Sequence, residues 1–74
     1  MEKIATILVF KTNIQHRQDV HKLKATLDHH AGILNWNVDT EDIDCVLRII
    51  TDELEPSDIL PLIAGCGFHC EELV

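Results

Sequence analysis

The sequence has few basic residues, few aromatic residues and no long apolar run. Its 74 residues include 6 Lys and Arg against 13 Asp and Glu, so the formal net charge is −7 with the five His neutral. General nucleic-acid binders and anchors to anionic membranes both need a basic face, and this charge argues against both classes. One Trp, two Phe and no Tyr also leave few side chains that could stack on RNA bases. The composition fits a soluble domain that binds a protein or a cation.

Cysteines and hydrophobic runs are too few for a secreted or membrane-anchored protein. Three cysteines are an odd number and do not suggest a disulfide scaffold. The apolar stretch at residues 4–10 is interrupted by Thr6, and it lacks the basic run and the cleavage site of a signal peptide. No run approaches the ~18 apolar residues of a membrane span. We therefore expect a cytoplasmic protein with reduced thiols.

The length predicts one domain over residues 1–74, and the charge within it is uneven. Residues 1–37 hold five bases and three acids, which gives +2, whereas residues 38–74 hold one base and ten acids, which gives −9. Such an asymmetry can orient a charged partner. The plainer interpretation is a solvated acidic surface that maintains solubility.

Hydrophobic periodicity predicts four strands and two helices in the order β-α-β-β-α-β. The strands are expected at residues 3–12, 33–38, 45–50 and 68–73. The first helix is expected at residues 17–31 with Gly32 as its stop, since apolar residues recur at helical spacing through Val20, Leu23, Leu27 and Ala31. Pro56 begins the second helix, Pro61 should make it short or kinked, and Gly65 and Gly67 should end it.

This order of elements predicts an α+β fold, the ferredoxin-like βαββαβ sandwich. Its four-stranded antiparallel sheet should carry both helices on one face and leave the other face open. In the third strand, Cys45, Leu47 and Ile49 share the inward face, while Val46, Arg48 and Ile50 share the more exposed one. The loops at residues 12–17, 39–44 and 65–68 should meet at one end of the sheet, where a site built by several loops is expected.

Four stretches match one family pattern over nearly the whole chain: Leu27 with Gly32-Ile33, then Trp36-x-Val38-Asp39, Pro56-x-Asp58-Ile59, and Cys66-Gly67-Phe68-x-Cys70-Glu71. The last two resemble the Pro-Glu-Asp-Ile and Ala-Gly-Tyr-x-Ala-Glu stretches of the heavy-metal-associated (HMA) domain. That domain occurs in copper chaperones and metal-transporting ATPases. The resemblance implies the ferredoxin-like fold, and it places Trp36 and Cys70 in the core.

The metal loop of that family is Gly-Met-x-Cys-x-x-Cys, and residues 13–19 (Asn-Ile-Gln-His-Arg-Gln-Asp) take its place here. Ile14 can replace the buried Met, and Asn13 tolerates left-handed backbone almost as Gly does. However, His16 and Asp19 stand where two thiolates should be. Sulfur holds soft Cu(I), whereas imidazole and carboxylate suit Zn(II) or a harder ion. The resemblance therefore implies a degenerate metal-binding site.

The candidate metal ligands are His16, Asp19 and Cys66. The first two are three residues apart at a helix start, so their side chains could converge on one ion, with Cys66 as the third ligand from another loop. The alternative is that Asp19 favours the helix dipole while His16 is a solvated loop residue. His69 and Cys70 would join Cys66 on one face only if this segment were helical. On a strand they point to opposite faces.

Two functions follow from these observations. The first is a non-enzymatic interaction or regulatory module that binds a protein partner, or a second copy, through the open sheet face or charged surfaces. The second is a Zn or Cu binding or carrier protein that uses His16, Asp19 and Cys66. An enzyme is the weakest alternative: acylphosphatase shares the topology, but no Gly-rich phosphate loop surrounds Arg17.

Overall fold

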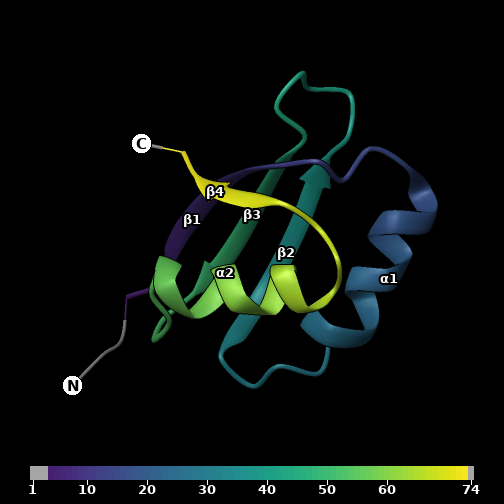
Figure 1. Cartoon of the computed structure of the whole chain (residues 1–74). Helices are drawn as coiled ribbons and strands as arrows, with labels where there is room; N and C mark the ends of the chain where they lie inside the picture. Colours follow the sequence, from purple (N-terminus) through teal and green to yellow (C-terminus); the bar gives the residue numbers. More distant parts are fainter. Residues whose placement is uncertain (1–3, 74) are drawn as a thin grey trace.

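The computed structural model describes residues 4–73 and contains the six elements in the expected order (Figure 1). They are β1 (Thr6–Thr12), α1 (Arg17–Leu27), β2 (Ile33–Asp39), β3 (Val46–Thr51), α2 (Pro56–Gly65) and β4 (Cys70–Glu72). The strands form one antiparallel sheet in the order β2-β3-β1-β4. This is the ferredoxin-like α+β sandwich that the sequence predicts. Lys3, where the first strand was expected to begin, lies outside the described residues.

The core lies between the sheet and both helices. The fully buried cluster draws on β1, the following loop, both helices and β3, and it consists of Phe10, Ile14, Leu23, Leu27, Leu47, Ile49, Ile59 and Ile63. Each helix contributes a pair spaced four residues apart, which is the spacing of one helix face. Because both pairs join the same cluster as the alternating residues of β3, both helices cover the same face of the sheet.

The first helix ends at Leu27, so its expected extension to Ala31 is wrong. The backbone N–H of Asp28 donates to Lys24 O as the last helical bond, and the Asp28 carboxylate then accepts a 2.7 Å hydrogen bond from Trp36 Nε1. Gly32 has another role than a helix stop. A Cβ at this position would lie 2.9 Å from Leu54 side-chain atoms, so the α1–β2 connection can pack this closely only with glycine.

The third strand begins at Val46, one residue later than expected, because Cys45 adopts left-handed backbone with φ +46°. Thr12 holds this residue in place, since its hydroxyl donates a 2.6 Å hydrogen bond to Cys45 O. The Cys45 side chain is buried, as expected for a packing residue. Val46 is only 7% exposed, so its expected exposure is wrong. A short branched side chain inside a strand row is covered by its longer neighbours.

The second helix begins with Pro56 at its first turn and contains Pro61, and at ten residues it is short, as predicted. Gly65 is its last residue, and Gly67 makes the following turn with φ +90°. The final strand is shorter than expected because Phe68 N still donates to Ile63 O in that turn. No helix within residues 4–73 is long and apolar enough to cross a membrane.

Candidate functional site

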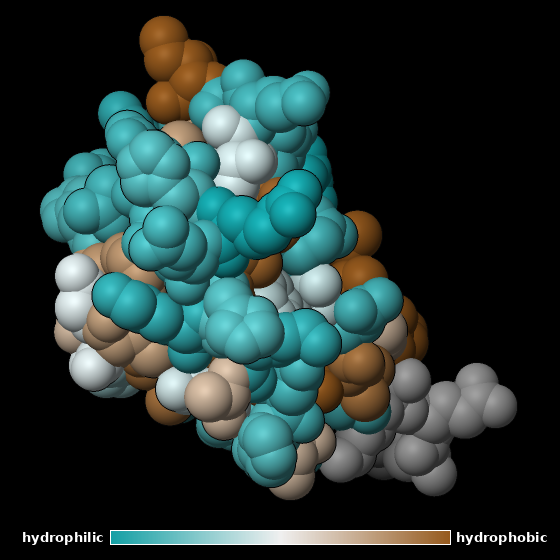
Figure 2. Space-filling model, turned by 90° about the vertical axis from the view of Figure 1, so that its right-hand side faces the viewer, coloured by the Kyte–Doolittle hydropathy of each residue, from teal (hydrophilic) through white to brown (hydrophobic). Residues whose placement is uncertain are grey.

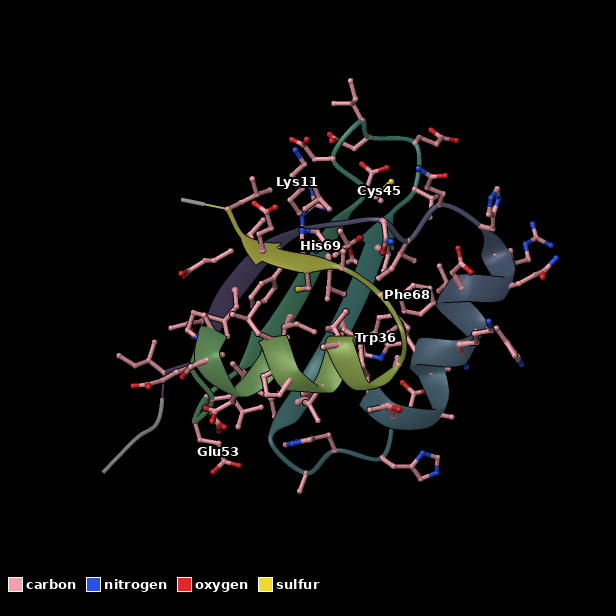
Figure 3. All side chains as sticks on the ribbon, in the orientation of Figure 1. Lys11, Trp36, Cys45, Glu53, Phe68 and His69 are labelled. Carbon is pink, nitrogen blue, oxygen red and sulfur yellow. The ribbon has the colours of Figure 1, made fainter. Side chains whose placement is uncertain are left out.

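Three connections meet at one end of the sheet, as the topology predicts. Thr12 N donates to Asp44 O at 3.0 Å, which joins the end of β1 to the β2–β3 loop. Asn13 Oδ1 accepts a 2.9 Å hydrogen bond from His69 N, which joins the β1–α1 loop to the start of β4. Figure 3 shows Lys11, Cys45 and His69 at this end, with Glu53 at the opposite one. We call this region the loop end.

Within the loop end, residues 13–19 are held by internal contacts. Ile14 is fully buried, which fits its expected role in place of a buried Met, and its N–H donates to Thr12 Oγ1. Asn13 keeps ordinary backbone and acts through its side chain instead, because Cys45 is the one non-glycine residue with positive φ among residues 4–73.

Asp19 occupies the third position of α1 and caps the start of the helix. Its Oδ2 accepts hydrogen bonds from the backbone N–H groups of His16 at 3.2 Å and Gln15 at 3.4 Å. His16 is the N-cap residue and is exposed. The structure thus brings His16 and Asp19 together, but it commits the carboxylate to N–H groups that the helix start would otherwise leave without acceptors.

Cys66 lies away from that pair. It is the C-cap residue of α2, and its thiol donates to Thr26 Oγ1 at 3.4 Å. Thr26 lies ten residues beyond His16 along α1, or about 15 Å at the helical rise. Within residues 4–73 no three His, Cys, Asp or Glu side chains are grouped so that they could hold a metal ion. The set His16, Asp19 and Cys66 therefore stays a prediction that needs the α2–β4 turn to move.

The remaining cysteine and histidine candidates separate onto two faces. Cys70 packs against the core from β4, and burial together with the neighbouring Glu71 carboxylate raises the pKa of its thiol to about 11. A thiol with this pKa stays protonated at neutral pH and is a poor ligand. His69 is exposed, and its Nε2 lies 2.8 Å from Glu71 Oε1. The hydrogen bond and charge of His69 lower the pKa of Glu71.

Trp36 packs against the core and is half-buried, which agrees with the expected packing role. Its indole N–H donates to Asp28, which also lies 3.7 Å from Lys24 Nζ. The sequence contains no spacing signal for this Trp36–Asp28 contact, since a loop and a strand separate the two residues. The outward side of α1 is polar, and Figure 2, which faces this side, shows mostly hydrophilic groups.

No protein-family model and no curated protein matches the chain. Solved structures do match it. The apo HMA domain of the copper chaperone for superoxide dismutase superposes with a TM-score of 0.82 at 19% identity, over 100% of this chain and 72% of that one. The yeast copper transporter domain gives 0.77 at 16% identity, over 92% of this chain and 94% of that one. This chain has the fold of an HMA domain.

A third HMA-like structure extends the likeness to bacteria. The putative copper-ion-binding protein from Bacillus anthracis str. Ames gives a TM-score of 0.77 at 12% identity, over 95% of this chain and all of that one. At these identities the likeness establishes the HMA-like fold alone. The assignment of residues 13–19 to the degenerate metal loop of that fold stays a prediction from the sequence.

Proposed function

We propose that this chain is a small cytoplasmic interaction or regulatory module with an HMA-like fold, and that it acts through protein contacts rather than catalysis or metal transfer. The carboxylate of Asp19 carries the proposal. It stands where the resemblance expects the second thiolate, and it accepts two backbone N–H groups at the start of α1. A group used in this way stabilises the loop without an ion.

Protein contacts have a precedent in the fold. One matched structure is the Atx1–Cu(I)–Ccc2a complex, in which domains of this kind associate; it gives a TM-score of 0.78 at 17% identity. In this chain the opposite charges lie on different surfaces. Arg17, Lys22 and Lys24 are on α1, whereas Glu41 and Asp42 are in the β2–β3 loop. Both the charged surfaces and the open sheet face are available for a partner.

The local surroundings of Arg17 support a non-enzymatic role. The residue is exposed at the first position of α1 rather than enclosed in an anion-binding loop. Among residues 4–73, every buried side-chain nitrogen or oxygen has a hydrogen-bond partner. Active sites often keep polar groups unpaired for a substrate, and the described part of this chain keeps none.

The alternative function is a Zn or Cu binding or carrier protein that uses His16, Asp19 and Cys66. One observation favours it: the His16 N-cap and the Asp19 carboxylate are already neighbours at the loop end. A copper-loaded structure of this fold also exists in the first domain of the human copper chaperone, with a TM-score of 0.79 at 19% identity. However, the Asp19 carboxylate would have to release its two backbone N–H groups to bind an ion.

Metal titration against a competing chelator separates the two functions. Zn(II) and Cu(I) are titrated into the wild-type protein and into His16→Ala, with His21→Ala as a matched control because it removes an exposed imidazole elsewhere on α1. We expect the three proteins to bind no more metal than their free thiols account for. Sub-micromolar binding that is lost in His16→Ala and kept in His21→Ala would overturn the proposal.

A further inference from the structure

The face of the sheet opposite the helices carries an apolar centre. Strand alternation and the β1–β3 register place Ile7 beside Ile50 on this face. Ile7 is 61% exposed, although it is a large apolar residue in the middle of the chain's longest apolar stretch. Val9 follows on the same face, and Leu73, whose N–H donates to Val9 O, is 37% exposed. Covering these side chains would remove apolar surface from water.

Charged side chains around this centre sum to zero. Lys11 on β1 and Arg48 on β3 supply two positive charges, and Asp39 on β2 and Glu71 on β4 supply two negative ones. The whole chain carries −7. Two copies that met through their acidic halves would repel each other, whereas two copies that met through this neutral face would not. The balance of charge therefore favours a second copy of the chain as the occupant.

The arrangement of these charges is also self-complementary. Lys11 and Glu71 are register partners on the neighbouring strands β1 and β4. A two-fold axis that runs parallel to these strands and between them exchanges the two positions in a facing copy. Lys11 then opposes Glu71 of the partner subunit, and Glu71 opposes Lys11 of the partner subunit. The same operation sets Val9 against Leu73 of the partner subunit, so charge and apolar surface match together.

We infer that the chain forms a homodimer by stacking the open faces of two sheets, with reciprocal Lys11–Glu71 pairs beside a shared apolar centre. The inference rests on the proposed function and names its partner as a second copy. Two sheets stacked in this way lie about 10 Å apart with their helices outside. The outward side of α1 stays uncovered and available for a further partner.

The test is sedimentation velocity over a concentration series in the presence of EDTA, which excludes dimers bridged by metal. The wild type should show a monomer–dimer equilibrium. Lys11→Glu sets Glu against Glu, and Glu71→Lys sets Lys against Lys, so each variant alone should dimerise at least about tenfold more weakly, since like charges facing each other are costly. An equal mixture of the two variants should form a heterodimer with restored affinity.

The mixture keeps the test valid even if a substitution disturbs its own chain. Lys11 Nζ lies 3.7 Å from Asp44 Oδ1, and Glu71 pairs with His69, so each variant also loses an exposed local contact. Rescue by mixing reports only the contact between chains. Ile7→Lys should likewise abolish the dimer, while Ile43→Lys, at a 95% exposed apolar residue in the β2–β3 loop, should leave it intact.

A wild-type chain that stays monomeric throughout the series would overturn the inference, and so would a dimer that both charge variants keep. A dimer lost in Ile43→Lys but not in Ile7→Lys would place the contact elsewhere and also overturn it. None of these results affects the proposed function, which fails instead by tight metal binding that depends on His16.

Discussion

The two helix starts use the same capping arrangement with different neighbours. In α1, Asp19 Oδ2 accepts the N–H of His16 at 3.2 Å, and in α2, Asp58 Oδ2 accepts the N–H of Glu55 at 2.8 Å. Each carboxylate is at the third helical position and serves the residue three positions earlier. The α1 start lies where the resemblance expects a metal loop, while the α2 start has no such expectation. Capping alone therefore accounts for the position of Asp19.

The largest expected effect comes from restoring the thiolates at the α1 start. His16→Cys with Asp19→Cys creates the Cys-x-x-Cys spacing and should raise Cu(I) affinity by orders of magnitude, because two thiolates suit this soft ion. The matched double variant Glu55→Cys with Asp58→Cys installs the same spacing at the α2 start. Competition against a Cu(I) chelator measures both.

A gain at the α1 start that exceeds the gain at the α2 start would show that residues 13–19 keep the shape of a metal loop. Equal gains would mean that the two starts differ only in sequence, and would contradict the assignment of this segment to the metal loop.

The next effect concerns the buried residue beneath the α1 start. Ile14→Ala should lower the free energy of unfolding by ~2–5 kcal/mol, because it leaves a cavity at a fully buried site. Ile14→Met, which restores the family residue, should cost less than about 1.5 kcal/mol since the volume is similar. Urea denaturation measures both. A large loss with Met would show that the loop does not accept the family's packing.

Removing the two caps should have smaller and similar effects. Asp19→Ala and Asp58→Ala should each lower the free energy of unfolding by about 1 kcal/mol, since each leaves a backbone N–H at a helix start without its acceptor. Asn at either position should recover part of the loss because its carboxamide oxygen can still accept. Urea denaturation of the four variants at low salt tests this. A stability gain in Asp19→Ala alone would break the equivalence and point to a carboxylate kept for binding.

The smallest effect is a pH dependence at β4 that must be separated from the caps. The pKa of Glu71 is lowered from 4.5 by its contact with His69, so the ionised form is favoured in the folded state. This contribution is present above pH 4.5 and is lost as the pH falls below it. Glu71→Gln should flatten the acid limb of the stability curve slightly. An unchanged acid limb would show that the contact with His69 contributes nothing to folding.

The fold could be predicted because its signals are periodic and local. The pairs Leu23/Leu27 and Ile59/Ile63 have the spacing of a helix face, and the alternation at Leu47 and Ile49 marks the inward face of a strand. These patterns specify the elements, and the order of elements specifies the sheet.

The errors come from contacts between residues far apart in the sequence. Asp28 leaves the helix to accept the indole N–H of Trp36, and Cys45 takes left-handed backbone because the Thr12 hydroxyl binds its carbonyl oxygen. The site was predictable only in part for the same reason. The local pair His16 and Asp19 comes together as expected, whereas the position of Cys66 depends on the turn after α2 and on Thr26.

The most direct test of the central claim follows the backbone amide NMR signals of Gln15 and His16 during a Zn(II) titration, with the amide of Glu55 as an internal reference. These amides report whether the Asp19 and Asp58 carboxylates stay in place as caps. The account predicts that all three signals keep their positions at stoichiometric Zn(II). Selective shifts of Gln15 and His16, with Glu55 unmoved, would show that Asp19 leaves the helix start to bind metal and would contradict the account.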